Sequence, residues 1–291
     1  MTVNATFPAK LSLGSLYLAD RIFPHQRKWI GEAVGSFSTE IPENKILGIA
    51  LSGHVEEDLL ADMVEELKSF ESIDLSTIRY TSKNLSSVSK IESLKELRLD
   101  FTPFEDSHVS TLKSLTNLST VWLLYSAITN KGLKNLSGMP NLENLVIKNT
   151  EVSDGGMIHL KEFKSLKSLL LPSQITDKGF EEIAPLTMLL HLDASYTQIS
   201  DTGMNILGRL TSLNSLYLSD TGITDFGLGA LSNLTNLGTL YLSGTKITNK
   251  GLKHLESLKT LTYLEIRDTK VTERGADGLR SILTDCEIVS Q

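Results

Sequence analysis

Hydrophobic residues recur with a fixed period along most of this chain. A triplet of apolar, variable and apolar residues returns every 24 residues, with one step of 23, and its first members are Ile49, Ile73, Leu97, Val121, Leu145, Leu169, Leu192, Leu216, Leu240 and Leu264. The alternation within the triplet predicts a short strand, and a later Leu-x-x-Leu-x-x-Leu spacing predicts a short helix or 3₁₀ turn. One such unit cannot bury both of its apolar faces, so the sequence predicts ten stacked units with a continuous parallel sheet.

A Thr-Asp-x-Gly sequence, or a close variant, joins the strand to the helix in most units. A hydroxyl residue such as Ser200 or Thr224 is expected to cap the following turn, and the next residue, such as Asp201, places negative charge at the positive helix end. The glycine that follows, such as Gly203, is expected where the backbone approaches a neighbour closely or takes an unusual dihedral angle.

The repeat resembles the leucine-rich repeat family from about residue 46 to the C-terminus. It is most similar to the cysteine-containing type of F-box-associated proteins and to a bacterial version with Thr in place of Cys. The resemblance implies an α/β leucine-rich repeat solenoid, a ribonuclease-inhibitor-like horseshoe with a parallel sheet on its concave side. Hydroxyl residues, expected to donate to a carbonyl of the adjacent loop, replace the usual Asn at Thr102, Ser126, Thr150, Thr197, Thr221, Thr245 and Thr269.

The two ends of the chain lack the regular repeat. We expect residues 1–45 to form an N-terminal helical cap over the first strand, and residues 46–291 to form the repeat domain with a short C-terminal cap. The helix prediction rests on the spacing of Leu16, Leu18, Ile22, Phe23, Trp29, Ile30, Ala33, Val34 and Phe37. Near the C-terminus, Cys286-Glu287-Ile288 is expected to form a last short strand, with Cys286 as a small buried hydrophobic residue.

Composition narrows the possible compartments and partners. The formal net charge is −7, without a run of five like charges, which argues against a nucleic-acid partner or an acidic membrane surface. The single cysteine excludes an intrachain disulfide, and no apolar stretch is long enough to span a bilayer. We therefore expect a cytoplasmic monomer.

Residues with catalytic or metal-binding chemistry do not gather in the sequence. The histidines fall in different units or near the N-terminus, without the spacing of metal ligands, and no phosphate-binding loop motif is present. A row of carboxylates, including Asp177, Asp201 and Asp225, could hold calcium, but a position at helix starts explains each copy. We therefore expect no enzyme activity, no cofactor and no metal.

The middle residue of each triplet is expected to point to solvent on the concave face. Several of these residues are apolar or aromatic, and other large side chains lie beside them. The predicted partner-binding residues are Phe101, Trp122, Leu124, Tyr125, Val146, Leu170, Tyr196, Tyr217, Tyr241 and Tyr263. Large aromatic residues are enriched at binding hot spots, although Trp, Tyr and Val also simply favour strands.

These observations favour a non-catalytic module that binds a protein or peptide on its concave sheet. Two alternatives remain open at this point. The F-box-associated resemblance would fit a substrate-recognition subunit of a ubiquitin-ligase-like complex, and exposed aromatic side chains would also fit a carbohydrate-binding or structural repeat protein. The identity of a partner lies in variable surface residues, so the repeated leucines do not reveal it.

Overall fold

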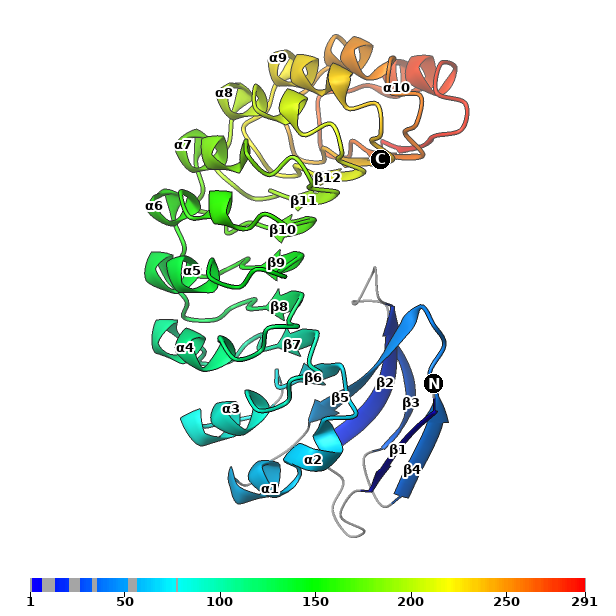
Figure 1. Ribbon diagram of the computed structural model, residues 1–291. Coiled ribbons are helices and arrows are strands. Elements are labelled where there is room, and N and C mark those ends of the chain that lie inside the picture. Colours follow the sequence, from blue (N-terminus) through cyan, green and yellow to red (C-terminus); the bar gives the residue numbers. More distant parts are fainter. Residues whose placement is uncertain are drawn as a thin grey trace. The chain divides into compact units, whose positions relative to one another are not determined.

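The chain folds into two compact units, each built from short strands and helices (Figure 1). The structure, a computed structural model, describes residues 2–6, 14–20, 27–32, 36–51, 57–76 and 78–290. The first unit comprises residues 1–128 and 138–142, and the second comprises residues 129–137 and 143–291.

The first unit has a sheet in which parallel repeat strands follow one another in sequence order and antiparallel strands continue one edge. The parallel strands are β5 (Lys45–Leu51), β6 (Ser72–Asp74), β7 (Glu96–Arg98) and β8 (Thr120–Trp122). β2 (Gly14–Asp20) pairs antiparallel with β5, and β3 (Arg27–Glu32) pairs antiparallel with β2. β1 (Thr2–Thr6) and β4 (Ser36–Glu40) form a separate antiparallel pair. The described helical segments are α1 (Glu57–Asp62), α2 (Val64–Leu67), α3 (Ser82–Val88), η1 (Asp106–His108) and α4 (Val109–Leu112).

The predicted N-terminal helices are wrong for the residues that the structure describes. Leu16 and Leu18 lie in β2, Trp29 and Ile30 lie in β3, and Phe37 lies in β4. β2 pairs with β3 along one edge and with β5 along the other. Its residues 16, 17 and 19 are completely buried, although neighbouring residues of a strand point to opposite faces. A strand covered on both faces loses the simple alternation of apolar and polar residues, so periodicity alone does not separate it from a helix. The remaining positions used for the prediction, 22, 23, 33 and 34, lie outside the described residues.

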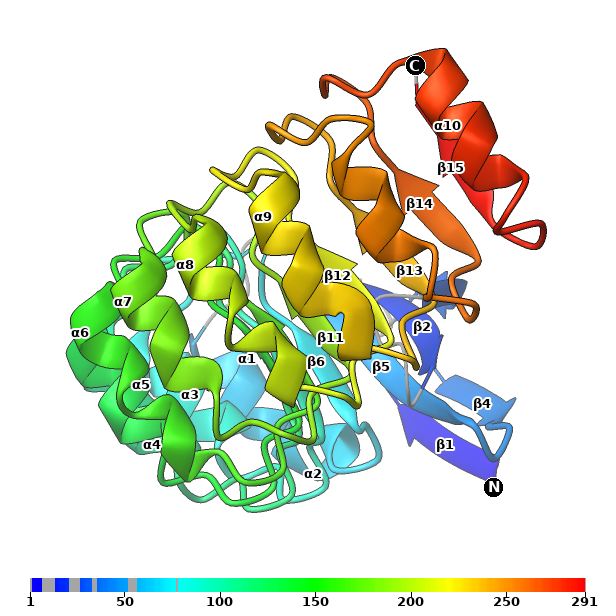
Figure 2. The ribbon, with the colours of Figure 1, turned by 90° about the horizontal axis from the view of Figure 1, so that it is seen from above.

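The second unit contains parallel strands in sequence order, and its helical segments cover one face of this sheet (Figure 2). The strands are β9 (Asn144–Val146), β10 (Ser168–Leu170), β11 (His191–Asp193), β12 (Ser215–Tyr217), β13 (Thr239–Tyr241), β14 (Tyr263–Glu265) and β15 (Glu287–Val289). The helical segments are α5 (Asn130–Leu136), α6 (Asp154–Met157), η2 (Leu160–Glu162), α7 (Asp177–Phe180), η3 (Glu181–Ile183), α8 (Asp201–Met204), η4 (Leu207–Arg209), α9 (Asp225–Leu228), η5 (Gly229–Asn233), η6 (Gly251–Leu255) and α10 (Glu273–Arg280). The predicted last strand is confirmed as β15.

Strand pairing aligns the repeat positions that the sequence period predicts. Leu192 pairs with Leu216, and Leu216 pairs with Leu240, so equivalent leucines form a row across the sheet. These side chains are completely buried, as are Leu228 and Leu231 on the helical side of the same repeat. Burying one such side chain contributes ~1.5–3 kcal/mol to folding, and each row is completed only by the neighbouring repeats.

A carboxylate at the start of a short helix connects one repeat to the next at Asp154, Asp177, Asp201 and Asp225. Asp177 Oδ1 accepts hydrogen bonds from the backbone N–H of Ser200 at 2.7 Å and of Gly203 at 3.1 Å. Its Oδ2 accepts from the Ser200 hydroxyl at 2.5 Å. Asp201 makes the same contacts to Thr224 and Gly227 in the following repeat. The carboxylate therefore serves the next repeat as well as its own helix.

The recurring glycine is explained by the same carboxylate. A Cβ atom added to Gly203 would lie 2.6 Å from Asp177 Oδ1, which is too close for any larger residue without a shift. The prediction of a close approach at this glycine is confirmed, and its backbone does not adopt a positive φ.

The corner threonine hydroxyls bond within their own loop, which corrects the prediction of a bond to the adjacent loop, and among the described residues the buried Ser126 Oγ has no hydrogen-bond partner. Thr197 Oγ1 donates to the Ala194 carbonyl at 2.6 Å, and Thr221 Oγ1 donates to the Leu218 carbonyl at 2.7 Å. The same contact to the residue three positions earlier occurs at Thr102, Thr150, Thr245 and Thr269. A hydroxyl side chain is shorter than the amide of Asn, so it reaches only its own turn.

Candidate functional site

In each unit, the sheet face opposite the helices carries the middle residue of each strand triplet, and we call it the open face of that unit. Most of the predicted partner-binding residues on it are partly exposed, including Trp122, Leu124, Leu170, Tyr217 and Tyr241. Val146 is only 3% exposed, so the prediction that it faces solvent is wrong.

Three predicted residues share an unusual backbone conformation at the corner that follows a strand. Phe101, Tyr125 and Tyr196 have φ values of 57°, 57° and 65°, which place them in the left-handed region. The conformation directs the backbone N–H to the next repeat, as in the 2.8 Å bond from Tyr196 to the Ser219 carbonyl. Equivalent corners elsewhere carry residues that tolerate this region better, namely Asn149, Asp220, Gly244 and Asp268.

These three aromatic side chains are also highly exposed. The exposed fractions are 65% for Phe101, 55% for Tyr125 and 59% for Tyr196. The left-handed conformation costs a non-glycine residue roughly 1–2 kcal/mol, and an exposed ring recovers little of it through burial. Phe101 and Tyr125 stack on each other with ring centroids 4.9 Å apart. Folding alone therefore does not explain why aromatic residues occupy these corners.

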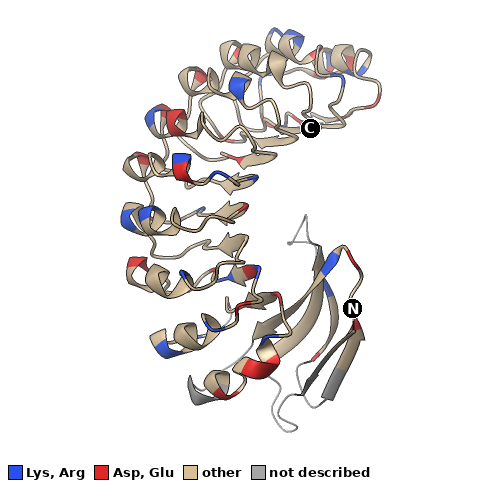
Figure 3. Cartoon of the chain, viewed as in Figure 1, with Lys and Arg blue, Asp and Glu red and all other residues tan. Residues whose placement is uncertain are grey.

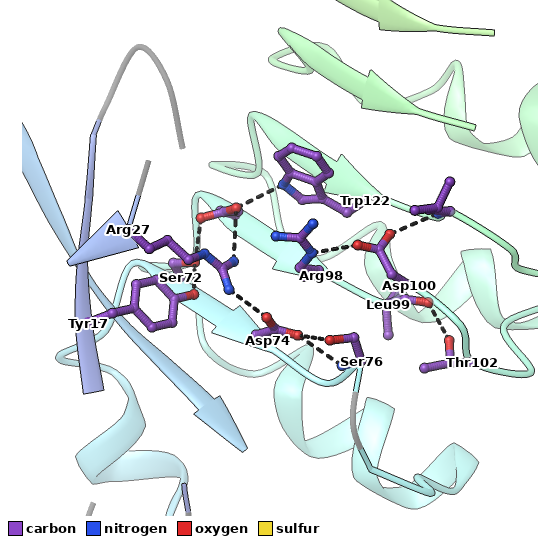
Figure 4. A network of polar contacts seen from close by, with 12 residues as sticks. Tyr17, Arg27, Ser72, Asp74, Ser76, Arg98, Leu99, Asp100, Thr102 and Trp122 are labelled. Carbon is purple, nitrogen blue, oxygen red and sulfur yellow. Dashed lines mark hydrogen bonds and ion pairs between the residues drawn. The ribbon is translucent and has the colours of Figure 1, made fainter. Parts of the chain in front are cut away.

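Within the first unit, Trp122 lies between a cation and a buried carboxylate (Figure 4). The guanidinium of Arg98 lies 4.3 Å from the ring centroid of Trp122 and donates to Asp100 at 2.5 Å. The indole N–H of Trp122 donates to Glu96 Oε1 at 2.8 Å. Trp122 is therefore held in place by its neighbours and does not protrude freely from the open face.

Strand β3 contributes an arginine to the same face. Arg27 donates to Asp74 at 2.5 Å and to Glu96 at 3.3 Å, and its guanidinium lies 4.2 Å from the ring centroid of Tyr17 (Figure 4). The Tyr17 hydroxyl and Ser72 Oγ are 2.7 Å apart. These contacts attach the N-terminal strands of the first unit to its first repeat strands.

Glu96 is the most deeply buried charged group in this cluster, with 1% of the residue exposed. Burial raises the pKa of the Glu96 carboxyl, and this effect outweighs the opposite influence of Arg27 and of the hydrogen bonds from Ser72 and Trp122. Burial likewise raises the pKa of Tyr17, with the Glu96 charge as the second cause.

Within the second unit, three tyrosines form a continuous ladder on the open face. The ring centroids of Tyr217 and Tyr241 are 4.7 Å apart, and those of Tyr241 and Tyr263 are 5.2 Å apart. The Tyr263 hydroxyl donates to Glu265 Oε2 at 3.2 Å, and Ser243 donates to Glu265 Oε1 at 2.9 Å. Desolvation, followed by the effect of Tyr241, raises the pKa of Tyr263 to about 12. The Tyr263 hydroxyl therefore keeps its proton at neutral pH and acts as a donor to Glu265.

A lysine and a carboxylate lie beside the exposed Tyr196 in the same unit. Lys148 Nζ lies 2.6 Å from Asp193 Oδ2 and 5.4 Å from the ring centroid of Tyr196. Asp193 also accepts the backbone N–H of Ser195 at 2.9 Å through its other oxygen. The predicted residue Tyr196 thus belongs to a mixed aromatic and charged group.

Sequence reasoning did not select the charged residues that accompany the aromatic rings. Lys148, Asp193 and Glu265 occupy positions on or next to the row of middle residues, so their location on the open face was available from the period. The period did not predict their contacts, because Lys148 and Asp193 are 45 positions apart in the sequence. Arg27 carried no such signal, since its segment lacks the repeat. Acidic and basic residues are otherwise interspersed over the strands and helices of each unit (Figure 3).

Comparisons with known proteins agree with this architecture. Residues 211–271 match the family model described as leucine rich repeat. An internalin (inlF) from Listeria monocytogenes strain 4b F2365 superposes with a TM-score of 0.53 and 18% identity, covering 84% of this chain and 85% of that protein. The chain has a leucine-rich repeat fold. Internalin C2 from the same strain gives a TM-score of 0.57 and 22% identity, covering 80% of this chain and 92% of that protein.

A third similar structure is that of a TDR receptor, with a TM-score of 0.55 and 16% identity, covering 84% of this chain and 42% of the receptor chain. Identities this low support the fold and carry no information on ligands. No curated protein sequence matches the chain. In the described ranges, none of the helices has the length and apolar character needed to cross a membrane, and no group of three or more His, Cys, Asp or Glu side chains could hold a metal ion.

Proposed function

We propose that this leucine-rich repeat chain is a non-catalytic module that binds a protein or peptide partner on its open face. The observation that carries the proposal is the placement of Phe101, Tyr125 and Tyr196 in left-handed conformations with more than half of each residue exposed. Strained residues persist where function requires them, and rigid aromatic side chains bury a large area for a small loss of entropy on binding.

The proposal treats each unit as having its own contact surface. The surface of the first unit consists of Phe101, Tyr125 and the partly exposed Trp122 and Leu124. The surface of the second unit consists of Leu170, Tyr196 and the ladder of Tyr217, Tyr241 and Tyr263. Exposed aromatic side chains of this kind dominate the binding energy of many protein interfaces.

The two alternatives are not favoured. A carbohydrate ring packs against the flat face of an aromatic side chain, whereas the faces of Tyr217 and Tyr241 are turned toward each other at an interplanar angle of 20°. A role in a ubiquitin-ligase-like complex needs an adaptor-binding segment, and nothing in the described residues points to one.

The test is capture of partners by the immobilised chain from a lysate of its source cells. The test variant replaces the three corner aromatics together, as Phe101→Asn, Tyr125→Asn and Tyr196→Asn. The matched control is Phe226→Asn, which removes an aromatic side chain that is 89% exposed in helix α9. Proteins retained by the wild type and the control but lost by the test variant would support the proposal. Equal capture by all three chains would exclude the corner aromatics from binding.

A further inference from the structure

On the open faces of the two units, an aromatic ring and a carboxylate lie together in several groups. In three of these groups, a lysine or arginine side chain of the same chain contacts both the ring and the carboxylate. Each cation lies over a ring and forms an ion pair with a carboxylate on the same face. The three groups are Arg27 with Tyr17 and Asp74, Arg98 with Trp122 and Asp100, and Lys148 with Tyr196 and Asp193. The combination is favourable because the ring quadrupole and the carboxylate both attract the same positive charge.

A fourth group in the second unit has the same ring and carboxylate chemistry but a different set of partners. Glu265 accepts hydrogen bonds from the neutral hydroxyl groups of Tyr263 and Ser243, at 3.2 and 2.9 Å. Among the described residues, no lysine, arginine or histidine nitrogen lies within ion-pair distance of this carboxylate. Arg267, two positions further along the chain, is exposed; its backbone N–H donates to Ser243 Oγ at 3.1 Å, and its carbonyl accepts the backbone N–H of Gly244 at 2.9 Å.

The surroundings of Glu265 favour a positively charged ligand. Glu265, Tyr241 and Tyr263 are each partly exposed, so a side chain from another molecule can reach them. Two further carboxylates, Asp220 and Asp268, are exposed at the corners that follow β12 and β14. Among the described residues, the side-chain donors to Glu265 are the neutral hydroxyl groups of Tyr263 and Ser243, so a cationic ligand can still form an ion pair with this carboxylate.

We propose that Glu265, with Tyr241 and Tyr263, binds a lysine or arginine side chain of a peptide partner, as the chain's own cations are bound at the other three groups. This inference rests on the proposed function, because it specifies the chemistry of the partner on the same open face. The cation would pair with the Glu265 carboxylate beside the tyrosine rings, and the rest of the peptide would continue over the ladder.

The experiment selects binders from a phage-displayed library of random peptides on the immobilised full chain. Enriched sequences are then synthesised with a fluorescent label, and their affinities are measured by fluorescence anisotropy. The variant Glu265→Gln removes the charge but keeps an oxygen that can accept a hydrogen bond. Glu181→Gln, at an exposed position in η3, is the matched control for loss of one negative charge. Thermal unfolding of each variant verifies that it is folded.

We expect the enriched peptides to contain a recurrent lysine or arginine, and Glu265→Gln to weaken their binding about tenfold or more while Glu181→Gln leaves it unchanged. Replacing the recurrent basic residue of the peptide by norleucine should weaken binding to the wild type but add little to the effect of Glu265→Gln. If peptides are enriched that bind Glu265→Gln as tightly as the wild type, but lose binding with Tyr241→Ala, the basic-ligand inference is overturned and peptide binding stands. If no peptide is enriched, peptide recognition by this face is rejected and the inference with it.

Discussion

Asp177 and Ser200 join two successive repeats through a pair of hydrogen bonds. One carboxylate oxygen of Asp177 accepts the backbone N–H of Ser200 at 2.7 Å, and the other accepts its hydroxyl at 2.5 Å. The sequence explains this aspartate as a charge at a helix start, which is a property of one repeat. The structure adds that the same side chain caps the next repeat, so its effect on stability belongs to the interface between two repeats.

We predict that Asp177→Ala lowers the free energy of unfolding by about 2–3 kcal/mol, since it leaves the donors of Ser200 and Gly203 without their acceptor. Urea denaturation followed by circular dichroism measures the change. Asp285→Ala, which removes an exposed carboxylate near the C-terminus, should change stability by less than about 0.5 kcal/mol. Equal effects of the two substitutions would contradict the bridging role.

Gly203→Ala should destabilise the chain by about 1–3 kcal/mol, because the added methyl group would meet the Asp177 carboxylate. The two substitutions should also be coupled. In the Asp177→Ala background the carboxylate is gone, so Gly203→Ala should cost about 1 kcal/mol less than in the wild type. A double-mutant cycle of unfolding free energies tests this, and strictly additive effects would show that the glycine is needed for another reason.

Tyr196→Asn should leave the unfolding free energy within about 0.5 kcal/mol of the wild-type value. Asn tolerates the left-handed backbone better than Tyr, which stabilises the folded state. This gain in free energy is close to the loss that comes from removing the contact between the Tyr196 ring and Lys148. Leu123→Ala, at a completely buried position, should cost about 2–5 kcal/mol by comparison. A loss of several kcal/mol in Tyr196→Asn would mean that this tyrosine serves stability, which would weaken the case for binding.

The raised pKa of Glu96 predicts a specific pH dependence of stability. A carboxyl group that binds its proton more tightly in the folded state contributes stability below its ordinary pKa of 4.5, and this contribution is lost as the pH rises through the folded-state pKa. The wild type should therefore lose stability relative to Glu96→Gln as the pH rises from about 4.5. Urea denaturation of both chains at a series of pH values above 4.5 measures the difference in their unfolding free energies. If the wild type instead gains stability relative to Glu96→Gln as the pH rises, the pKa of Glu96 is lowered in the folded state and not raised.

Cys286 should react slowly with alkylating reagents in the folded chain. Burial raises the pKa of this thiol to about 11 from an ordinary value of 9.0. At pH 8 the reactive thiolate should then be about 100-fold scarcer than in the unfolded chain. Mass spectrometry after timed exposure to iodoacetamide, with and without urea, compares the two rates. Because the chain has a single cysteine, any alkylated thiol is assigned without ambiguity.

Parts of the candidate site were predictable because they depend on strand periodicity. The middle position of each triplet placed Tyr217 and Tyr241 on one face, and the structure brings their rings into contact. The same rule failed for Val146, which is buried, because periodicity gives the direction of a side chain and not how far its neighbours cover it. Trp122 follows the rule, but its hydrogen bond to the buried Glu96 makes it part of the structural framework as well.

The sequence by itself determined the leucine-rich repeat fold, the position of each repeat strand and the close approach at the recurring glycine. These follow from the local spacing of apolar residues, which repeats with each unit and forces the units to stack. Only the tertiary structure decided the strand conformation of residues 14–20, the left-handed corners, and the pairing of Arg27 with Glu96 across 69 positions. Contacts of this kind join side chains from different repeats, or from outside the repeat, and the spacing within one unit contains no information about them.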